Sequence, residues 1–413
     1  MSKKIYTVAN DLGYGSMKLT INEDRYNIPS VISLQKENDI TKPVSFDNKT
    51  QEKNYINELI DNLDVTITSP SVKTIGRFLI GKRATISNST ARRFNVNSFK
   101  GKADEDLSLI LTLSSIAAHV VKDNYESDEE LPSSLKAKVI MATALPIKEG
   151  KSETVTENYR NRFLNKKHTV TILNFEEPIQ VEIEFVNVYI GLEGNMAQVS
   201  IRTPNKELKD SIWQEVKKDY PKIAESISID DIINANNTFG IDIGEGTTDF
   251  TVITDGKLNS SASSSIKQGY GKILEKSAVI LQDKNVNVKS RTDLIRLLNQ
   301  PHNYFNDGLI ATANEVISEQ ADSLIDAINE QLMATLNDNP GSLPLVIYVF
   351  GGGAQPLNES SSIKQRLEET FNGFTGNQNR PVIFIDKKFS QRLNNCGLET
   401  IAKVLTDKYQ KNN

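Results

Sequence analysis

The sequence predicts an α/β protein of two domains, and three observations support this prediction. The chain has 413 residues, which is more than one ordinary hydrophobic core accommodates, so a division into two domains is expected. Strand-like and helical segments alternate along the chain, a pattern that is typical of α/β folds. A short glycine-containing motif near the N-terminus also occurs again in the second half, which indicates two related domains.

The first half opens with two strands joined by a glycine-rich turn, which predicts a β-hairpin. A later segment carries apolar residues at helical spacing, and a buried strand and then a strand with alternating apolar residues follow it. Residues 36–100 are expected to contain an exposed insertion, because their first part, 36–64, is polar and lacks apolar periodicity. The predicted elements of this half are strands at 4–9, 17–21, 78–80, 137–142 and 181–189 and a helix at 105–122.

The second half repeats the opening pattern of strand, glycine loop and strand. A long amphipathic helix and a buried strand that ends in three glycines follow, and the chain closes with a helix. The predicted elements are strands at 238–243, 248–254, 345–350 and 382–385 and helices at about 205–218, 308–337 and 395–409.

Composition restricts the location and partners of the protein. No apolar run approaches the ~20 residues of a membrane span, and the first residues show no signal-peptide or amphipathic-helix pattern, so neither a signal peptide nor a membrane anchor is expected. The single cysteine, Cys396, excludes an internal disulfide and favours a cytoplasmic location. One Cys and three scattered His argue against a structural zinc site. A net charge of -5 provides no general attraction to nucleic acid, so no direct DNA contact is expected.

The repeated motif is the most informative feature of the sequence. Asn10-Asp11-Leu12-Gly13-Tyr14-Gly15-Ser16 is echoed 231 residues later (242 − 11) by Ile241-Asp242-Ile243-Gly244-Glu245-Gly246-Thr247. In both copies a strand leads to the Asp, two glycines alternate, a hydroxyl residue follows, and a second strand begins. The alternative interpretation, an ordinary hairpin turn, explains one copy well but explains two copies in matching strand contexts poorly.

The residue types of the motif suit phosphate binding. Glycines allow backbone N–H groups to approach anionic oxygens closely. Hydroxyl donors come from Ser16, Thr247 and Thr248, and Lys18 adds a positive charge. Because an Asp in each loop would repel phosphate, Asp11 and Asp242 are expected to act through a cation, and Mg²⁺ prefers such oxygen ligands and retains several waters.

Two further glycine-containing segments could contribute to a nucleotide site. Gly351, Gly352 and Gly353 follow a buried strand, where close backbone approach to an adenosine is possible, although glycines also end ordinary strands. Glu193 lies in Gly191-Leu192-Glu193-Gly194, between the two halves, where a carboxylate could orient the water that attacks a γ-phosphate. The alternative for Glu193 is a solvated acid that the dipole of a following helix favours.

The order of these motifs resembles that of the actin/Hsp70/sugar-kinase superfamily over essentially the whole chain: two phosphate motifs, two connecting motifs and an adenosine motif. Within it, the sequence resembles bacterial actin-like ATPases of the ParM type, on the evidence of Ile28-Pro29-Ser30, the stretch 78–84 and Thr143-Ala144-Leu145-Pro146. The segment Asn395-Cys396-Gly397 departs from the usual Ala-x-Gly of the second connecting motif.

The resemblance implies an actin-like fold of two ribonuclease-H-like domains around a nucleotide cleft. Domain I would comprise residues 1–190, with a C-terminal helix at about 398–413 returning to it, and domain II residues 191–397. Glu193, Asp11 and Asp242 would be catalytic, and Asp11 and Asp242 would hold Mg²⁺. The implied nucleotide-binding residues are Gly13, Tyr14, Gly15, Ser16, Lys18, Gly244, Glu245, Gly246, Thr247, Thr248, Lys272, Glu275, Gly351, Gly352 and Gly353.

The implied function is an ATPase that polymerises head to tail into cytoplasmic filaments, with ATP as nucleotide and GTP left open. Such a filament would segregate plasmid DNA through a small DNA-binding adaptor, and the insertion would contact the next subunit. One alternative is a metabolic kinase of the same superfamily, for which no acceptor-side base beyond Asp11 is found. Another is a cell-shape or phage-encoded actin homologue; the absence of a membrane anchor argues against a membrane-attached, shape-determining one.

Overall fold

A computed structural model describes residues 4–36, 42–87, 89–95, 101–376 and 378–412. The chain divides into two compact units, one of Met1–Leu192 with Asn395–Asn413 and the other of Glu193–Asn394. These divisions lie two and three residues from the boundaries expected at 190/191 and 397/398. Among the described residues, every helix is too short or too polar to cross a bilayer.

The first unit is built on a ten-stranded sheet with the order β3-β2-β1-β8-β10-β9-β5-β6-β4-β7. The pairs β1–β2 and β2–β3 are antiparallel, whereas β1–β8 and β8–β10 are parallel. The strands are β1 (Ile5–Leu12), β2 (Ser16–Ile21), β3 (Asp24–Pro29), β4 (Val31–Leu34), β5 (Asp64–Thr68), β6 (Arg77–Ile80), β7 (Ala91–Arg93), β8 (Ser134–Leu145), β9 (His168–Ile172) and β10 (Ile179–Leu192).

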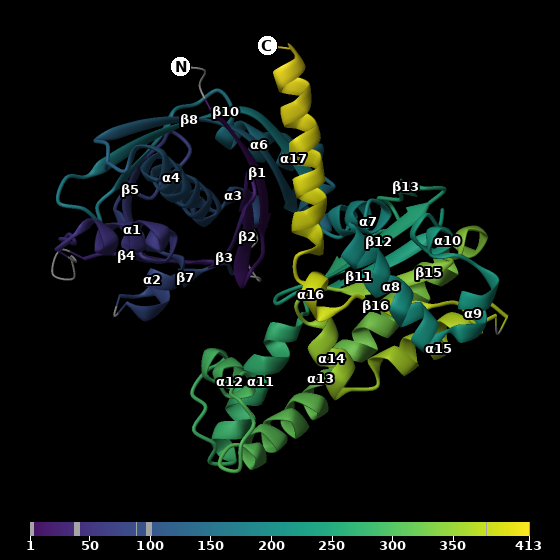
Figure 1. Cartoon of the computed structure of the whole chain (residues 1–413). Helices are drawn as coiled ribbons and strands as arrows, with labels where there is room; N and C mark the ends of the chain where they lie inside the picture. Colours follow the sequence, from purple (N-terminus) through teal and green to yellow (C-terminus); the bar gives the residue numbers. More distant parts are fainter. Residues whose placement is uncertain (1–3, 37–41, 88, 96–100, 377, 413) are drawn as a thin grey trace. The chain divides into compact units, whose positions relative to one another are not determined.

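Helix α4 (Asp106–Asp128) is the central helix of this unit, and Figure 1 shows the sheet curving around it. Buried residues extend from Leu107 to Val121 without interruption, because strands cover more than one side of the helix. The remaining helical elements are α1 (Lys49–Asn57), η2 (Leu59–Asp61), α2 (Gly81–Ile86), α3 (Gly101–Asp104), α5 (Ile147–Gly150), α6 (Glu153–Phe163) and α17 (Leu393–Asn412), which enters this unit at Asn395.

The expected exposed insertion, 36–100, is more structured than its composition suggested. Helix α1 begins at the N-cap Asn48, buries Ile56, and is followed by the buried Leu59. Strand β5 then joins the sheet by pairing with β9. A few buried apolar residues, such as Ile56 and Leu59, are enough to pack such a segment against a large core. Because most of its other residues are polar, the segment shows no clear apolar periodicity in the sequence. Residues 37–41, 88 and 96–100 of the expected insertion lie outside the described residues.

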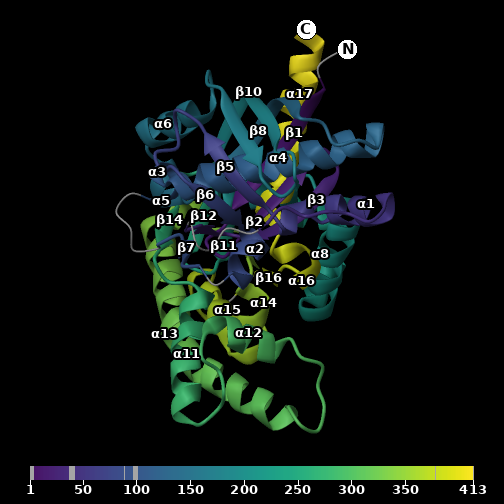
Figure 2. The same cartoon turned by 90° about the vertical axis from the view of Figure 1, so that its left-hand side faces the viewer.

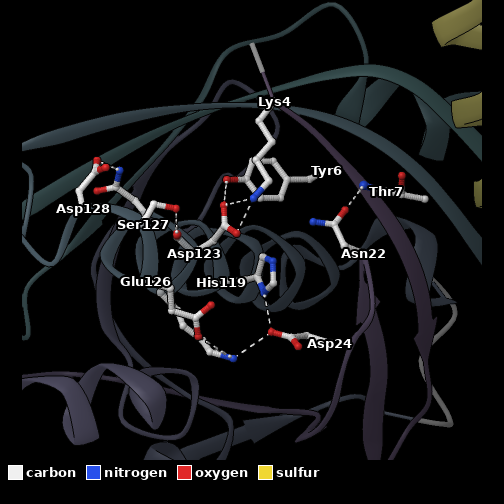
Figure 3. Close-up of polar contacts among 12 residues, drawn as sticks. Lys4, Tyr6, Thr7, Asn22, Asp24, His119, Asp123, Glu126, Ser127 and Asp128 are labelled. Atoms are coloured by element: carbon white, nitrogen blue, oxygen red, sulfur yellow. Dashed lines mark hydrogen bonds and ion pairs between the residues drawn. The ribbon is translucent and has the colours of Figure 1, made fainter. Parts of the chain in front are cut away.

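A polar cluster anchors α4 to the first strands (Figure 3). Asp123 accepts hydrogen bonds from Tyr6 (2.7 Å) and Lys4 (2.5 Å). His119 is buried, and its Nδ1 lies 3.7 Å from the Asp24 carboxylate, which also pairs with Lys122. Burial lowers the pKa of His119 from 6.5 to about 4, although Asp24 and Asp123 oppose this shift. The imidazole is therefore neutral in the folded protein at neutral pH.

The second unit has a six-stranded sheet with the order β13-β12-β11-β15-β16, and β14 also pairs with β12. Figure 2 shows α11 and α13 lying alongside one another in this unit. The strands are β11 (Thr238–Ile243), β12 (Thr248–Thr254), β13 (Lys257–Leu258), β14 (Ser264–Ile266), β15 (Val346–Phe350) and β16 (Val382–Phe384). The helical elements are α7 (Asn195–Arg202), α8 (Lys206–Asp219), α9 (Pro221–Ser226), α10 (Ile229–Ile233), α11 (Tyr270–Asp283), α12 (Arg291–Leu298), α13 (Asp307–Asp338), η3 (Pro340–Ser342), α14 (Ala354–Ser360), α15 (Ile363–Phe374) and α16 (Lys387–Ser390).

Both units contain the same five-strand arrangement. In the first unit the order is β3-β2-β1-β8-β10, and in the second it is β13-β12-β11-β15-β16. In each, the first three strands form antiparallel hairpins and the last two add in parallel. One repeated glycine loop joins β1 to β2, and the other joins β11 to β12.

Candidate functional site

The first glycine loop connects β1 to β2 and is closed by its own backbone. The N–H of Gly13 donates to the carbonyl of Ser16 at 3.1 Å. A Cβ on Gly13 would lie 2.7 Å from that same oxygen, so this turn excludes a side chain. Ser30 donates from Oγ to the Gly13 carbonyl (2.7 Å) and from N–H to the Gly15 carbonyl (3.0 Å). Two loop carbonyls are therefore held by a residue to which the sequence assigned no role.

The two charged side chains of this loop have no partners among the described residues. Asp11 is 6% exposed, yet its carboxylate accepts no hydrogen bond there, and Lys18 forms no ion pair. The Lys18 Nζ lies 3.3 Å from the position that a Cβ on Gly13 would occupy, which places the ammonium beside the loop. Nest-like backbone with an adjacent cation is suited to an anion.

The second glycine loop connects β11 to β12 and is closed in the same way. The N–H of Gly244 donates to the carbonyl of Thr247 at 2.9 Å. The start of α11 holds this loop, because the N–H groups of Tyr270 and Gly271 donate to the carbonyls of Gly244 and Glu245, each at 2.9 Å. Within the described chain, no group accepts a hydrogen bond from the N–H of Gly246.

The hydroxyl groups of the second loop have partners within the protein. Thr247 Oγ1 donates to Asp249 (3.1 Å), and Thr248 Oγ1 donates to the carbonyl of Gln268 (2.8 Å). Ser265 also donates to the buried Asp249. Both threonine hydroxyls thus donate to acceptors within the protein. Their contacts with phosphate remain a prediction.

The three-glycine turn packs directly against the second loop. Gly351 adopts φ +96°, and a Cβ there would lie 2.3 Å from Asp242 Oδ1 and 2.5 Å from the carbonyl of Ile243. The N–H of Gly353 donates to that same carbonyl at 2.8 Å. The turn and the end of β11 thus form one compact backbone surface beside a carboxylate, and a side chain at Gly351 would destroy it.

The connector contributes Glu193, which immediately follows β10 and precedes α7. It is 8% exposed. The next residue, Gly194, has φ +75°, and a Cβ there would lie 2.1 Å from Thr251 Oγ1. The side chain of Asn394 accepts from the N–H of Gly194 (2.9 Å) and donates to Asp242 Oδ2 (2.6 Å). Nothing in the sequence distinguished Asn394 from the other asparagines of the chain.

The remaining predicted residues lie at the edges of these loops. Tyr14 packs edge-on against Phe94, and Lys102 Nζ lies 4.2 Å from its ring centroid. On α11, Lys272 donates to the carbonyl of Lys267 and Glu275 pairs with Arg291.

Arg291 is a second residue that sequence reasoning missed. It also pairs with Glu245 of the second loop at 2.5 Å, and thereby ties that loop to α11. No described group of three or more His, Cys, Asp or Glu side chains is close enough to hold a metal ion.

The predicted residues thus form two sets. Asp11, Gly13, Tyr14, Gly15, Ser16 and Lys18 lie together in the first unit. Asp242, the second loop, the three-glycine turn and Glu193 lie in the second. A five-strand core with an Asp-x-Gly-x-Gly hairpin, present twice in one chain, defines the actin-like class of fold.

Comparison with protein families gives the same result. The model "Actin like proteins N terminal domain" matches residues 9–194, and "Archaeal actin homologue MreB-like, C-terminal" matches residues 240–362. This chain belongs to the actin-like proteins, as its motifs predicted. Comparison with curated proteins gives no match.

Solved structures share the fold along the whole chain. The actin-like protein Alp7A is 17% identical, with 99% of both chains covered and a TM-score of 0.68. Bacillus thuringiensis ParM with ATP is 13% identical, covers 98% of this chain and 100% of its own, and has a TM-score of 0.60. Ta0583, an archaeal actin homologue, is 16% identical, with 97% and 99% covered and a TM-score of 0.59.

Proposed function

We propose that this chain is a Mg²⁺-dependent ATPase whose nucleotide is bound by both glycine hairpins together and whose assembly depends on that nucleotide. The observation that carries this proposal is the duplication: both units place an Asp-x-Gly-x-Gly hairpin at the same point of the same strand order. Each such hairpin supplies backbone donors that suit a polyphosphate. Structures of B. thuringiensis ParM, which shares the fold, have been solved with ATP, AMPPNP and ADP.

Within this proposal the residues have distinct roles. Lys18 and the N–H groups of Gly15 and Gly246 bind phosphate oxygens. The turn at 351–353 borders the adenosine. Glu193 accepts a hydrogen bond from the hydrolytic water and orients it toward the γ-phosphate.

The acidic residues fit a hydrated Mg²⁺ ion. Asp11 is a buried carboxylate without a described protein partner, which is the state expected of a group that binds cation or water. Asp11 and Asp242 would hold the ion, chiefly through water, because Mg²⁺ in nucleotide sites uses one or two carboxylates together with phosphate oxygens. When bound, the ion neutralises phosphate charge.

Assembly is the second part of the proposal. Tyr304 and Phe305 are 92% and 89% exposed and stack edge-on against each other, with the half-exposed Leu309 nearby in sequence. Exposed aromatic side chains are enriched at protein interfaces, so we assign this patch to contacts with a second copy of the chain. The cellular role that we propose is plasmid segregation by cytoplasmic filaments through a DNA-binding adaptor.

The test is nucleotide-dependent sedimentation. Protein at tens of micromolar should pellet at high speed with ATP and Mg²⁺ but not with ATP and EDTA. Glu193→Ala should still pellet but release phosphate more slowly, so that its polymer persists. Tyr304→Ser with Phe305→Ser should abolish pelleting while dilute protein still binds ATP. A wild-type chain that stays monomeric with Mg²⁺ and ATP contradicts the assembly proposal.

A further inference from the structure

Asn394 uses both ends of its side-chain amide to join two predicted site elements of the second unit. Its Oδ1 accepts from the N–H groups of Gly194 (2.9 Å) and Ala197 (3.1 Å), at the start of α7. Its Nδ2 donates to Asp242 Oδ2 at 2.6 Å, a short bond to a charged acceptor. One buried side chain therefore bridges the connector that carries Glu193 and the carboxylate of the second loop.

The backbone next to Asn394 is also attached to α7. Ser200 Oγ donates to the carbonyl of Leu393 at 2.7 Å, so the segment 393–394 follows α7 as a unit. Gly194 has φ +75°, and Thr251 Oγ1 occupies the space that a Cβ there would need, so this position favours glycine. A shift of the Asp242 carboxylate must therefore either break its bond to Asn394 or move the N-terminus of α7.

We propose that Asn394 is a positioning residue that couples Asp242 to Glu193. This inference rests on the ATPase proposed above. When Asp242 engages a nucleotide with its ion, the Asn394 amide follows the carboxylate, and its carbonyl sets the position of Gly194 and hence of Glu193. Occupancy of the second loop thus controls whether the catalytic carboxylate is in place.

The neighbouring residue provides a matched control. Asn395 is buried as well, donates to the carbonyls of Ala9 (3.2 Å) and Lys18 (3.0 Å), and accepts from Thr20 Oγ1 (2.8 Å). It holds the first hairpin and contacts no carboxylate through these bonds. Asn395→Ala therefore removes an identical side-chain amide, but one that bonds to the first unit.

The first experiment measures steady-state ATP hydrolysis. Asn394→Ala should lower kcat about tenfold, as loss of a partner that orients a metal-site carboxylate typically does, with KM for ATP changed far less. In a Glu193→Ala background, Asn394→Ala should produce no further fall, because its effect acts through Glu193. The same fall in both backgrounds would overturn the coupling.

The second experiment does not depend on hydrolysis. Amide hydrogen exchange over residues 193–202 should slow when wild-type protein binds MgAMPPNP. Asn394→Ala removes both the acceptor for Gly194 and Ala197 and the donor to Asp242. The nucleotide-induced slowing should therefore be lost in this variant, whereas Asn395→Ala should retain it.

The outcomes separate this inference from the proposed ATPase. Nucleotide-induced slowing at 193–202 that is equal in wild type and Asn394→Ala overturns the role of Asn394 and leaves the ATPase intact. A wild-type chain that neither binds MgAMPPNP nor slows exchange anywhere overturns both, because the coupling requires an occupied site.

Discussion

The two glycine hairpins are closed by equivalent backbone hydrogen bonds, but they differ in the charged residues that lie opposite one another on their strands. In the first, Asp11 lies opposite Lys18 across β1 and β2; in the second, Asp242 lies opposite Asp249 across β11 and β12. These are equivalent positions, since both pairs are separated by 231 residues. One hairpin therefore carries a carboxylate facing an ammonium group, and the other carries two buried carboxylates.

The difference shows how each hairpin is stabilised. Like charges directly opposite one another across strands are destabilising, and the second hairpin offsets this with neutral donors: Asn394 to Asp242, and Thr247 and Ser265 to Asp249. The first hairpin has no such donors to Asp11 within the described residues. Its charged groups have no protein partner among the described residues, whereas the carboxylates of the second already accept hydrogen bonds from neutral side chains.

The largest expected effect comes from the two loop aspartates. Asp11→Ala and Asp242→Ala should each lower ATP hydrolysis roughly 100-fold, because each removes a proposed ion-binding carboxylate. Their effects on stability should differ. Asp242→Ala leaves the buried Asn394 amide unpaired and should cost about 1–3 kcal/mol, whereas Asp11→Ala loses no described partner and should be neutral or stabilising. Urea unfolding of both variants would decide this, and equal destabilisation would contradict the comparison.

Acid should weaken the first unit more than the second. Burial lowers the pKa of both His119 and His168, which lie in the first unit, whereas His302 of the second is exposed. For His119 the unfolded chain binds the proton below about 6.5 and the folded chain only below about 4, so stability is lost as pH falls through this window.

Between pH 6.5 and 5 this loss should be on the order of 2 kcal/mol for His119. Hydrogen exchange at pH 7 and pH 5, corrected for intrinsic rates, should show greater acid sensitivity in α4 than in α13, and His119→Gln should reduce it. Uniform loss of protection across both units would show that these histidines do not dominate the acid response.

The smallest expected effect concerns the equivalent positions at which the first hairpin has Lys18 and the second has Asp249. Lys18→Met should weaken ATP binding about tenfold, since a charged hydrogen bond to phosphate is lost, and should leave stability nearly unchanged. Asp249→Asn should not weaken binding, because Asp249 is bonded to Thr247 and Ser265 rather than directed at a ligand. Calorimetric titration with MgAMPPNP measures both, and a comparable loss in Asp249→Asn would show that the hairpins share one ligand role.

The sequence by itself determined the hairpins and their repetition, because these depend on local patterns. Alternation and glycine placement predicted strands at 238–243 and 248–254, and β11 and β12 occupy those residues. The motif order also predicted the actin-like fold, which the family comparison confirms. The nucleotide roles of individual loop residues stay predictions.

Only the tertiary structure decided which residues support the loops. Ser30 binds the first loop, Arg291 pairs with the second, and Asn394 reaches Gly194 and Asp242 from 200 and 152 residues away. Periodicity reports which face of an element is buried but carries no information on what a polar side chain meets after folding. A buried asparagine must find partners for its amide, and the packing of β11, α7 and α17 determines which partners those are.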